Sequence, residues 1–322
     1  MRSSFALIAI ALAACGNSDH AADLGLDEGM PDFAPSCLCA MHTQFVIDSM
    51  RVPKSNSEFA VDLNGDGTPD DQLGTIAGAL EIENLDPQVS VDDALANGTE
   101  VVLIEERSDG EVTSANAITM FERGDAMNPD AGTNYVIDSS ISPSSLVGAI
   151  DASVFQSTPP AMNDLTLTLP IPLFEGVAPL VLTLHGARVR YTNATGALTL
   201  GQINGAITKQ DMDTIVVPAV AQILTNKLHD PATSASTKQQ IKSTFDIGDG
   251  NGGNCTNPDG SVSMPNDGAI GACEVLSVMI IANLLSPDVQ LFQNGAYAPN
   301  PANAKKDSVS VGLGFTARSA TF

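Results

Sequence analysis

The fold of this chain is decided by the stretch Leu180-Val-Leu-Thr-Leu-His-Gly-Ala-Arg-Val-Arg-Tyr191. Leucine recurs at every second position before Gly186, which is the period of a strand with one buried face. After Gly186 the apolar positions shift by one residue, to Ala187, Val189 and Tyr191. Because a change of phase at a glycine is typical of a β-bulge, the stretch predicts a strand that bends at Gly186.

Turn residues and further alternating segments surround this strand. The residues Asn193-Ala-Thr-Gly196 predict a turn into a second strand, Leu198 to Ile207, and therefore an antiparallel hairpin. Near the end of the sequence, Val309 to Arg318 alternates apolar residues with serine, glycine and threonine, which predicts another strand with one buried face. Shorter runs predict strands at residues 45–52, 101–104, 117–121, 135–137 and 165–169.

Apolar residues at helical spacing predict helices between and after the strands. Residues 73–80 and 91–96 predict two short helices, and residues 233–245 a weaker one. We expect Asp211 to cap a helix that runs to Leu228 and is kinked at Pro218. The run 273–285 is apolar almost all round, which predicts a buried core helix.

These elements predict a mainly β or α+β domain over residues 37–322. The expected architecture is an antiparallel β-sandwich or sheet with a few packed helices. A repeated order of acidic loop and helix raises the alternative of two related halves, 37–150 and 151–322.

The charge of the chain excludes some partners. The 322 residues include 14 Lys and Arg against 38 Asp and Glu, and the net charge of −24 repels nucleic acid and anionic lipid surfaces. The signatures of serine hydrolases, zinc proteases, phosphate-binding loops and dinucleotide-binding proteins are missing from the sequence. The sequence therefore does not predict an enzyme.

The first residues predict export and attachment to a lipid. Met1 to Ala14 has the positive start and short apolar run of a secretory signal peptide. The residues Leu12-Ala-Ala-Cys15 resemble the lipobox of bacterial lipoproteins. This resemblance implies cleavage before Cys15 and acylation of that cysteine, by palmitate or a similar chain, and Gly16 implies sorting to the outer membrane. Residues 15–36 are acidic and polar, which predicts a flexible tether. The alternative is an ordinary signal peptide with an incidental cysteine.

Four further cysteines predict disulfide bonds in an exported protein. A bond between Cys255 and Cys273 would close a short loop and stabilise the fold by about 3 kcal/mol. Cys37 and Cys39 would then pair across one residue, which is near the limit of disulfide geometry. Bonds between the N-terminal and the C-terminal pair are therefore an open alternative.

The segment Asp62-Leu-Asn-Gly-Asp-Gly-Thr-Pro-Asp70 carries oxygen ligands at alternate positions, and Gly67 permits a sharp turn between them. It resembles the calcium loops of EF-hands, dockerins and thrombospondin type 3 repeats, and the resemblance implies a structural Ca²⁺ ion. Leu73 stands where an EF-hand has its bidentate Glu, so that Asp70 or Asp71 would have to replace this ligand. The expected ligands are Asp62, Asn64, Asp66, Thr68 through its carbonyl, and Asp70.

A second acidic, glycine-rich loop follows residue 245 and offers Asp246, Asp249 and Asn251 as candidate metal ligands. Because Gly, Asn and Asp are also common in irregular surface loops, a loop without a metal is the alternative. Among the histidines, His185 lies on the polar side of its strand, where it is either a base, a ligand or a solvated residue. His229 ends a helix, where it is expected to interact with the last carbonyl groups.

Taken together, the lipobox, the Asp62 loop and the C-terminal strand resemble uncharacterised surface lipoproteins of myxobacteria, a resemblance that implies no activity. We expect a lipoprotein of the bacterial cell envelope that is anchored in the outer membrane through acylated Cys15. It is expected to act as a binding or structural module for a protein, glycan or lipid ligand. The alternatives are a secreted hydrolase without a recognised signature and a carrier of a lipid or another hydrophobic ligand.

Overall fold

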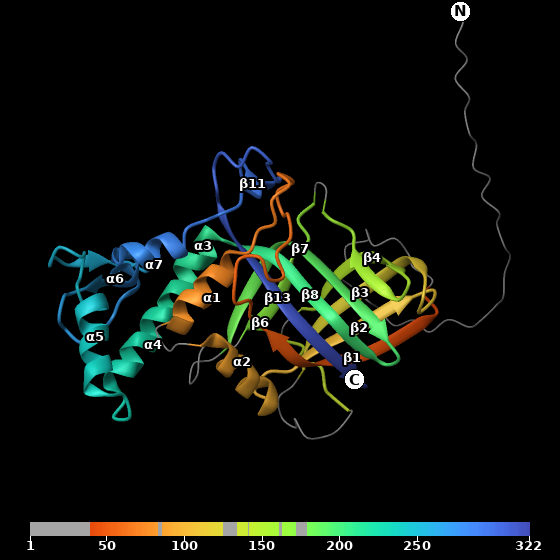
Figure 1. Cartoon of the computed structure of the whole chain (residues 1–322), viewed down its shortest axis with the longest axis horizontal. Helices are drawn as coiled ribbons and strands as arrows, with labels where there is room; N and C mark the ends of the chain where they lie inside the picture. The colour runs from red at the N-terminus through yellow and green to blue at the C-terminus, as the bar shows by residue number, and fades with distance from the viewer. Residues whose placement is uncertain (1–38, 83–85, 125–133, 141, 161–162, 172–178) are drawn as a thin grey trace, which may run out of the picture. The chain divides into compact units, whose positions relative to one another are not determined.

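The computed structural model describes residues 39–322 except 83–85, 125–133, 141, 161–162 and 172–178. Within this part of the chain, nine strands form one antiparallel sheet in the order β5-β4-β3-β2-β1-β13-β8-β7-β6 (Figure 1). The strands are β1 (Met41–Arg51), β2 (Val102–Ser108), β3 (Ser114–Arg123), β4 (Ser144–Asp151), β5 (Val154–Ser157), β6 (Leu167–Ile171), β7 (Leu180–Ala194), β8 (Ala197–Thr208) and β13 (Ser308–Ser319).

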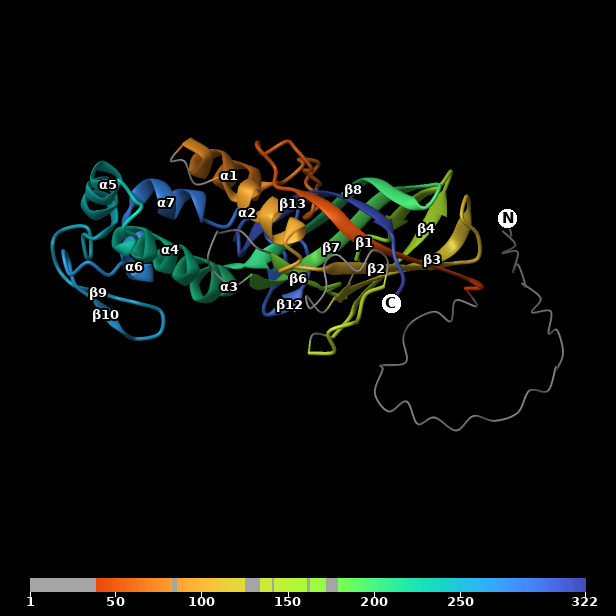
Figure 2. The ribbon, with the colours of Figure 1, turned by 90° about the horizontal axis from the view of Figure 1, so that it is seen from below.

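The sheet closes on itself because β7 has two partners on one edge. Its first residues pair with β6, and Arg190 to Thr192 pair with β5. Since β5 also pairs with β4, the strands from β5 to β7 form a barrel-like ring, seen from two directions in Figures 1 and 2. The predicted mainly β, antiparallel fold with packed helices is confirmed. Its strands form one closed sheet instead of the two facing sheets of a sandwich, because β1 and β13 join the early and late strands.

The strand β7 bends at Gly186 as predicted. The φ angle of Gly186 is 61°, and the register with β8 shifts between His185 and Arg188. Apolar side chains face the core on both sides of the bend, with Leu184 before it and Val189 after it. The turn at Asn193-Ala-Thr-Gly196 then leads into β8, which confirms the predicted hairpin.

The inside of the closed sheet is filled by side chains. Phe45, Phe155 and Tyr191 are fully buried, and the rings of Phe155 and Tyr191 are stacked with their centroids 4.9 Å apart. The Tyr191 hydroxyl donates to Glu106 Oε2 at 2.7 Å and lies 2.7 Å from the hydroxyl of Thr119. Burial raises the pKa of Glu106. The described interior is therefore a packed core, and it contains a cluster of polar side chains that hydrogen-bond to one another.

The strand β13 differs from its prediction because both of its faces are buried up to Phe315. The alternate positions are glycine at 312 and 314, and a Cβ atom there would lie 2.6 Å from the Phe59 carbonyl oxygen and 2.4 Å from the Phe59 ring, respectively. The segment before the Asp62 loop thus packs directly on the outer face of β13. Glycine at these positions makes the close approach possible.

Two helices lie against this part of the sheet. The helix α1 (Gln72–Ile82) contacts β13, and α2 (Pro87–Ala96) contacts β1. Both were predicted from the sequence, but α2 begins earlier than expected, since Asp86 caps it by accepting from the Gln88 amide at 2.9 Å. Within residues 135–137, predicted as a strand, only Ile137 forms a β-bridge, an isolated one with Gly124.

The chain between β8 and β13 in the sequence carries the remaining helices, several of which pack around a smaller apolar core. The predicted cap at Asp211 is wrong, because the helix begins earlier and Thr208 accepts from the Asp211 amide at 3.1 Å. A π-helical turn precedes Pro218 and accommodates the amide that proline lacks. These helices are α3 (Lys209–Asp211), the π-helical turn η1 (Met212–Val216), α4 (Val217–His229) and α5 (Ala235–Phe245).

The predicted buried helix over residues 273–285 is also wrong. It is broken at Val278 into α6 (Ala272–Ser277) and α7 (Met279–Leu284), and none of the residues of α7 is buried. Met279 is 77% exposed and Ile280 is 72% exposed. Apolar composition alone did not distinguish a helix inside the core from one at its surface. Short strand pairs complete the described chain, β9 (Cys255–Thr256) with β10 (Val262–Ser263) and β11 (Phe292–Gln293) with β12 (Ala296–Tyr297).

Candidate functional site

The side chains of the Asp62 loop accept hydrogen bonds from the backbone amides of the same loop. Asp62 Oδ1 accepts from the amide of Gly65 at 2.7 Å, and Asp62 Oδ2 accepts from that of Gly67 at 2.8 Å. Asn64 Oδ1 accepts from the Asp66 amide at 3.0 Å, and Asp66 Oδ1 accepts from the Thr68 amide at 2.7 Å. The hydrogen bond from the Thr68 amide lowers the pKa of Asp66. The loop therefore holds its oxygen-bearing side chains on one tightly turned backbone.

Side chains of the closed sheet hold this loop in place. The Arg188 guanidinium on β7 donates to the carbonyl oxygens of Asp62 at 2.6 Å and Leu63 at 3.3 Å. Asn204, opposite Arg188 on β8, donates to the carbonyl oxygen of Phe59. Leu63 is 1% exposed and packs with Val289 and other residues of a separate small core. The loop is thus fixed to the outer face of β7, β8 and β13.

Three carboxyl groups lie where the loop meets the helix α1 and residue 288. Burial, together with the charges of Asp288, Asp66 and Asp62, raises the pKa of Asp70 to about 6. Burial also raises the pKa of Asp71 to about 7 and that of Asp288 above its usual range. Asp71 Oδ1 accepts from the amides of Gly74 and Gly312, whereas its buried Oδ2 has no hydrogen-bond partner. The native fold therefore gathers buried carboxyl groups beside the loop, and their burial disfavours the ionised forms.

The oxygen ligands of the loop have the chemistry that a hard cation prefers, but in the structure they do not point toward one common position. Among the described residues, no three side chains of His, Cys, Asp and Glu are arranged so that they could hold a metal ion together. Asp62, Asn64 and Asp66 have oxygen atoms braced at alternate positions, as calcium loops require. Asp70 accepts from the Leu63 amide at 3.3 Å across the loop. Ca²⁺ binding would require Asp70 to act together with the braced side chains.

The second acidic loop is divided between two roles. Asp246 is buried; its Oδ1 accepts from the Asp267 amide and its Oδ2 from the Gly268 amide, both at 3.1 Å. Asp249 is exposed and accepts from the amide of Asn251 at 2.8 Å and from that of Gly253. Asp246 therefore binds the segment 267–268, whereas Asp249 binds amides of its own loop, and the two carboxylates share no hydrogen-bond partner among these amides.

The cysteine predictions fall partly within the described chain. Cys255 and Cys273 form a disulfide bond with a Cα–Cα distance of 5.9 Å, which confirms this pairing and excludes bonds from either to the N-terminal pair. Cys39 is disulfide-bonded as well, and Cys37 lies outside the described residues. The predicted lipidation residue Cys15, the signal peptide 1–14 and the tether 15–36 also lie outside them.

The structure places the two singled-out histidines differently. His229 Nδ1 lies 2.9 Å from the Thr225 carbonyl oxygen, as expected at a helix end. His185 Nδ1 pairs with Asp164 Oδ2, and Asp164 Oδ1 accepts from the Gly186 amide at 2.9 Å. Asp164 therefore holds both residues at the bend of β7.

Sequence reasoning missed Asp164, Arg188 and Asp288 as partners of these sites. Arg188 is 125 residues from Leu63 in sequence, and Asp288 is 22 residues from its partner Ser310. Only the position of Arg188 on the polar side of its strand indicated that it faces away from the core.

Comparison of the chain with protein-family models, with curated proteins and with solved structures gives no match. Within the described residues, none of the helices combines the length and apolar character needed to cross a bilayer.

Proposed function

We propose that the protein is a lipid-anchored lipoprotein of the bacterial outer membrane that acts as a binding module, with a structural Ca²⁺ ion in the Asp62 loop. The observation that carries the calcium proposal is the set of amide-braced side chains of Asp62, Asn64 and Asp66, with Asp70 next to them. The anchor is supported by the lipobox that ends at Cys15. Both parts are testable independently.

A bound cation would offset both the cost of burying the carboxylates of the loop and the repulsion between them. Asp70 and Asp71 have raised pKa values because they are buried near other carboxylates. A divalent cation favours their ionised forms and so favours the docked loop. Arg188 opposes this effect, since its positive charge lies against the loop backbone. With Leu73 in place of the usual Glu, we expect weak affinity, with Kd on the order of 10⁻⁴ to 10⁻³ M.

Calcium should therefore stabilise the folded protein. Binding to the native state alone adds about 2.7 kcal/mol at a hundredfold excess over Kd. We expect the melting temperature to rise by several degrees in about 10 mM CaCl₂ relative to EDTA. The double variant Asp66→Asn, Asp70→Asn should abolish the rise, because it removes two charges and keeps an oxygen for the amides of Thr68 and Leu63.

The matched control is Asp230→Asn with Asp259→Asn. These exposed residues also accept from nearby amides, of Ala232 and Ser261 respectively, both at 2.8 Å. The control should retain the full calcium response. A wild-type melt that does not respond to calcium, or a response that survives the loop variant, would show that this segment is only an acidic turn.

Lipid attachment should depend on one atom, the sulfur of Cys15. The variant Cys15→Ser keeps the signal peptide but cannot be acylated, so we expect an unprocessed precursor without the mass of attached acyl chains. Mass spectrometry of the N-terminal peptide and fractionation of cell envelopes measure this. Normal cleavage of the variant, or wild-type protein without added acyl mass, would contradict the lipoprotein assignment.

The alternatives receive less support. The Asp164–His185 pair is the feature that favours a hydrolase, but Asp164 also holds the Gly186 amide, so fixing the bend of β7 accounts for the pair. A carrier with its ligand inside the closed sheet is disfavoured by the filled interior around Phe45, Phe155 and Tyr191.

A further inference from the structure

Lys306 lies on the chain just before β13, close to the segment that carries the buried carboxyl group of Asp288. The Asp307 amide donates to the Val289 carbonyl oxygen at 2.9 Å. In the other direction, the Asp288 amide donates to the Ser308 carbonyl oxygen at 3.0 Å. These backbone bonds therefore hold Lys306 at the edge of the region where the Asp62 loop meets residue 288.

The positive charge of Lys306 acts on two carboxyl groups of this region. The hydrogen bond from the Thr68 amide is the main cause of the lowered pKa of Asp66, and the charge of Lys306 adds to it. Burial raises the pKa of Asp288, and the charge of Lys306 opposes this rise. Asp288 in turn acts on the loop, because its charge, next to burial, raises the pKa of Asp70. Lys306 thus interacts with the group of carboxylates to which the calcium loop belongs.

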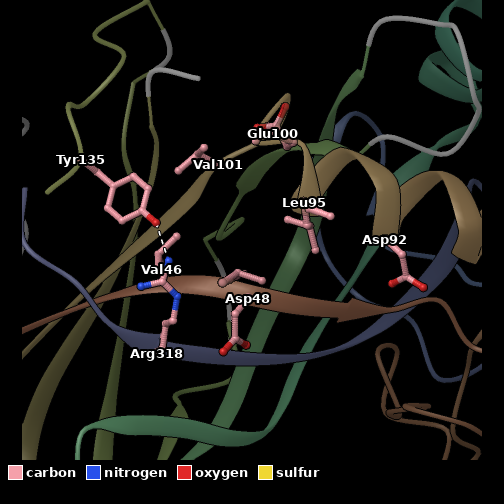
Figure 3. A pocket seen from close by; sticks show the side chains of 11 residues that line it. Val46, Asp48, Asp92, Leu95, Glu100, Val101, Tyr135 and Arg318 are labelled. Atoms are coloured by element: carbon pink, nitrogen blue, oxygen red, sulfur yellow. Dashed lines mark hydrogen bonds between the residues drawn. The ribbon is translucent and has the colours of Figure 1, made fainter. Parts of the chain in front are cut away.

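Other basic side chains of the structure have a direct partner. Arg318, in the wall of a cavity beside α2, donates to the Tyr135 hydroxyl at 2.7 Å (Figure 3). Lys209 donates to the carboxylate of Asp213 at 2.6 Å. Within the described residues, by contrast, the exposed side chain of Lys306 has neither a hydrogen bond nor an ion pair. Its charge is therefore not neutralised by direct contact with any one carboxylate.

We propose that Lys306 is a built-in counter-ion of the Asp62 loop, which stabilises the folded loop when no metal is bound and competes with Ca²⁺ for its carboxylates. Without metal, the ammonium group attracts Asp66 and Asp288 in the folded state, whereas the unfolded chain separates these groups. With metal, the same charge repels the doubly charged ion. The inference rests on the calcium site proposed above and names a residue that sets its affinity.

Removing this charge should change stability and calcium affinity in opposite directions. Asp66 is already ionised at neutral pH because its pKa is lowered, so Lys306 is not needed for its ionisation. What remains is repulsion between the ammonium group and the bound ion. We expect the Kd for Ca²⁺ to fall about three- to tenfold at low ionic strength when residue 306 is neutral. In about 1 M KCl, where the Debye length is about 3 Å, the difference should disappear.

Thermal melts of Lys306→Gln in EDTA and over a calcium titration test the inference on the full chain. In EDTA the variant should melt about 1–2 °C below the wild type, as expected for the loss of an exposed charge interaction. Its melting temperature should then rise more steeply with calcium, with a lower fitted Kd. Lys306→Arg keeps the charge and should behave like the wild type. Lys305→Gln is the matched control, because it removes the same charge at the neighbouring exposed residue, and it should change neither quantity.

A double-mutant cycle locates the effect at the loop. In EDTA, Lys306→Gln should destabilise the protein less in the background of Asp66→Asn, because one of the two attractive interactions is then missing. Equal calcium affinity of Lys306→Gln and the wild type, or an equal effect of Lys305→Gln, would overturn the inference. A wild type that does not respond to calcium would instead refute the calcium site and the competition with it. The melts in EDTA would then show separately whether Lys306 stabilises the loop.

Discussion

Replacing Tyr191 with alanine is expected to lower the free energy of unfolding by about 3–5 kcal/mol, the usual cost of removing a large aromatic side chain from a core. Tyr191 is fully buried, stacks on Phe155 and meets the ring of Phe315 edge to face at 6.3 Å. The substitution also leaves the buried carboxylate of Glu106 without its hydroxyl donor. Urea denaturation followed by circular dichroism measures the change.

The variant Tyr191→Phe separates the two contributions. It keeps the ring contacts and removes only the hydroxyl that donates to Glu106, so we expect a smaller loss of about 1–3 kcal/mol. Tyr135→Ala is the matched control, because Tyr135 is only partly buried and lies outside the main core. If Tyr191→Ala lowered the free energy of unfolding no more than Tyr135→Ala does, the description of a packed interior in the closed sheet would be wrong.

Removing the disulfide bond with the double variant Cys255→Ser, Cys273→Ser should destabilise the protein by about 3 kcal/mol, since the bond closes a loop over 18 positions. The loss should be concentrated in the helical part, where the bond links β9 to α6. Limited proteolysis should cut the variant between residues 246 and 272 at protease concentrations that leave the wild type intact. Differential scanning calorimetry measures the thermodynamic change.

Reduction of the wild type breaks the same bond without changing side-chain size, but it also breaks the bond of Cys39, so the reduced serine variant is its matched reference. The reduced wild type and the reduced serine variant should give the same stability and cleavage pattern. The segment keeps other constraints, since buried Glu274 accepts from the amides of Gly248 at 2.7 Å and Gly271 at 2.8 Å. A variant as stable and protease-resistant as the wild type would show that these carboxylate bonds suffice without the disulfide.

The sequence by itself determined those features that depend on neighbouring residues. The alternation before and after Gly186 predicted a bent strand, and the turn after Asn193 predicted its hairpin, because side chains alternate between the two faces of any strand. The short separation of Cys255 and Cys273 likewise indicated their bond. The spacing of oxygen ligands from Asp62 to Asp70 identified the candidate metal loop, although whether it binds calcium remains a prediction.

Only the tertiary structure decided which elements meet. Alternation does not specify a strand's partner, so the pairing of β5 with β7 that closes the sheet could not be read from either strand. The same holds for the bond between Tyr191 and Glu106, which are 85 residues apart, and for the contact of Arg188 with the Asp62 loop. Burial of both faces of β13 and the exposure of α7 also depend on which segments pack nearby. A local sequence pattern fixes the direction of a side chain, whereas the group that it meets is set by the packing of distant segments.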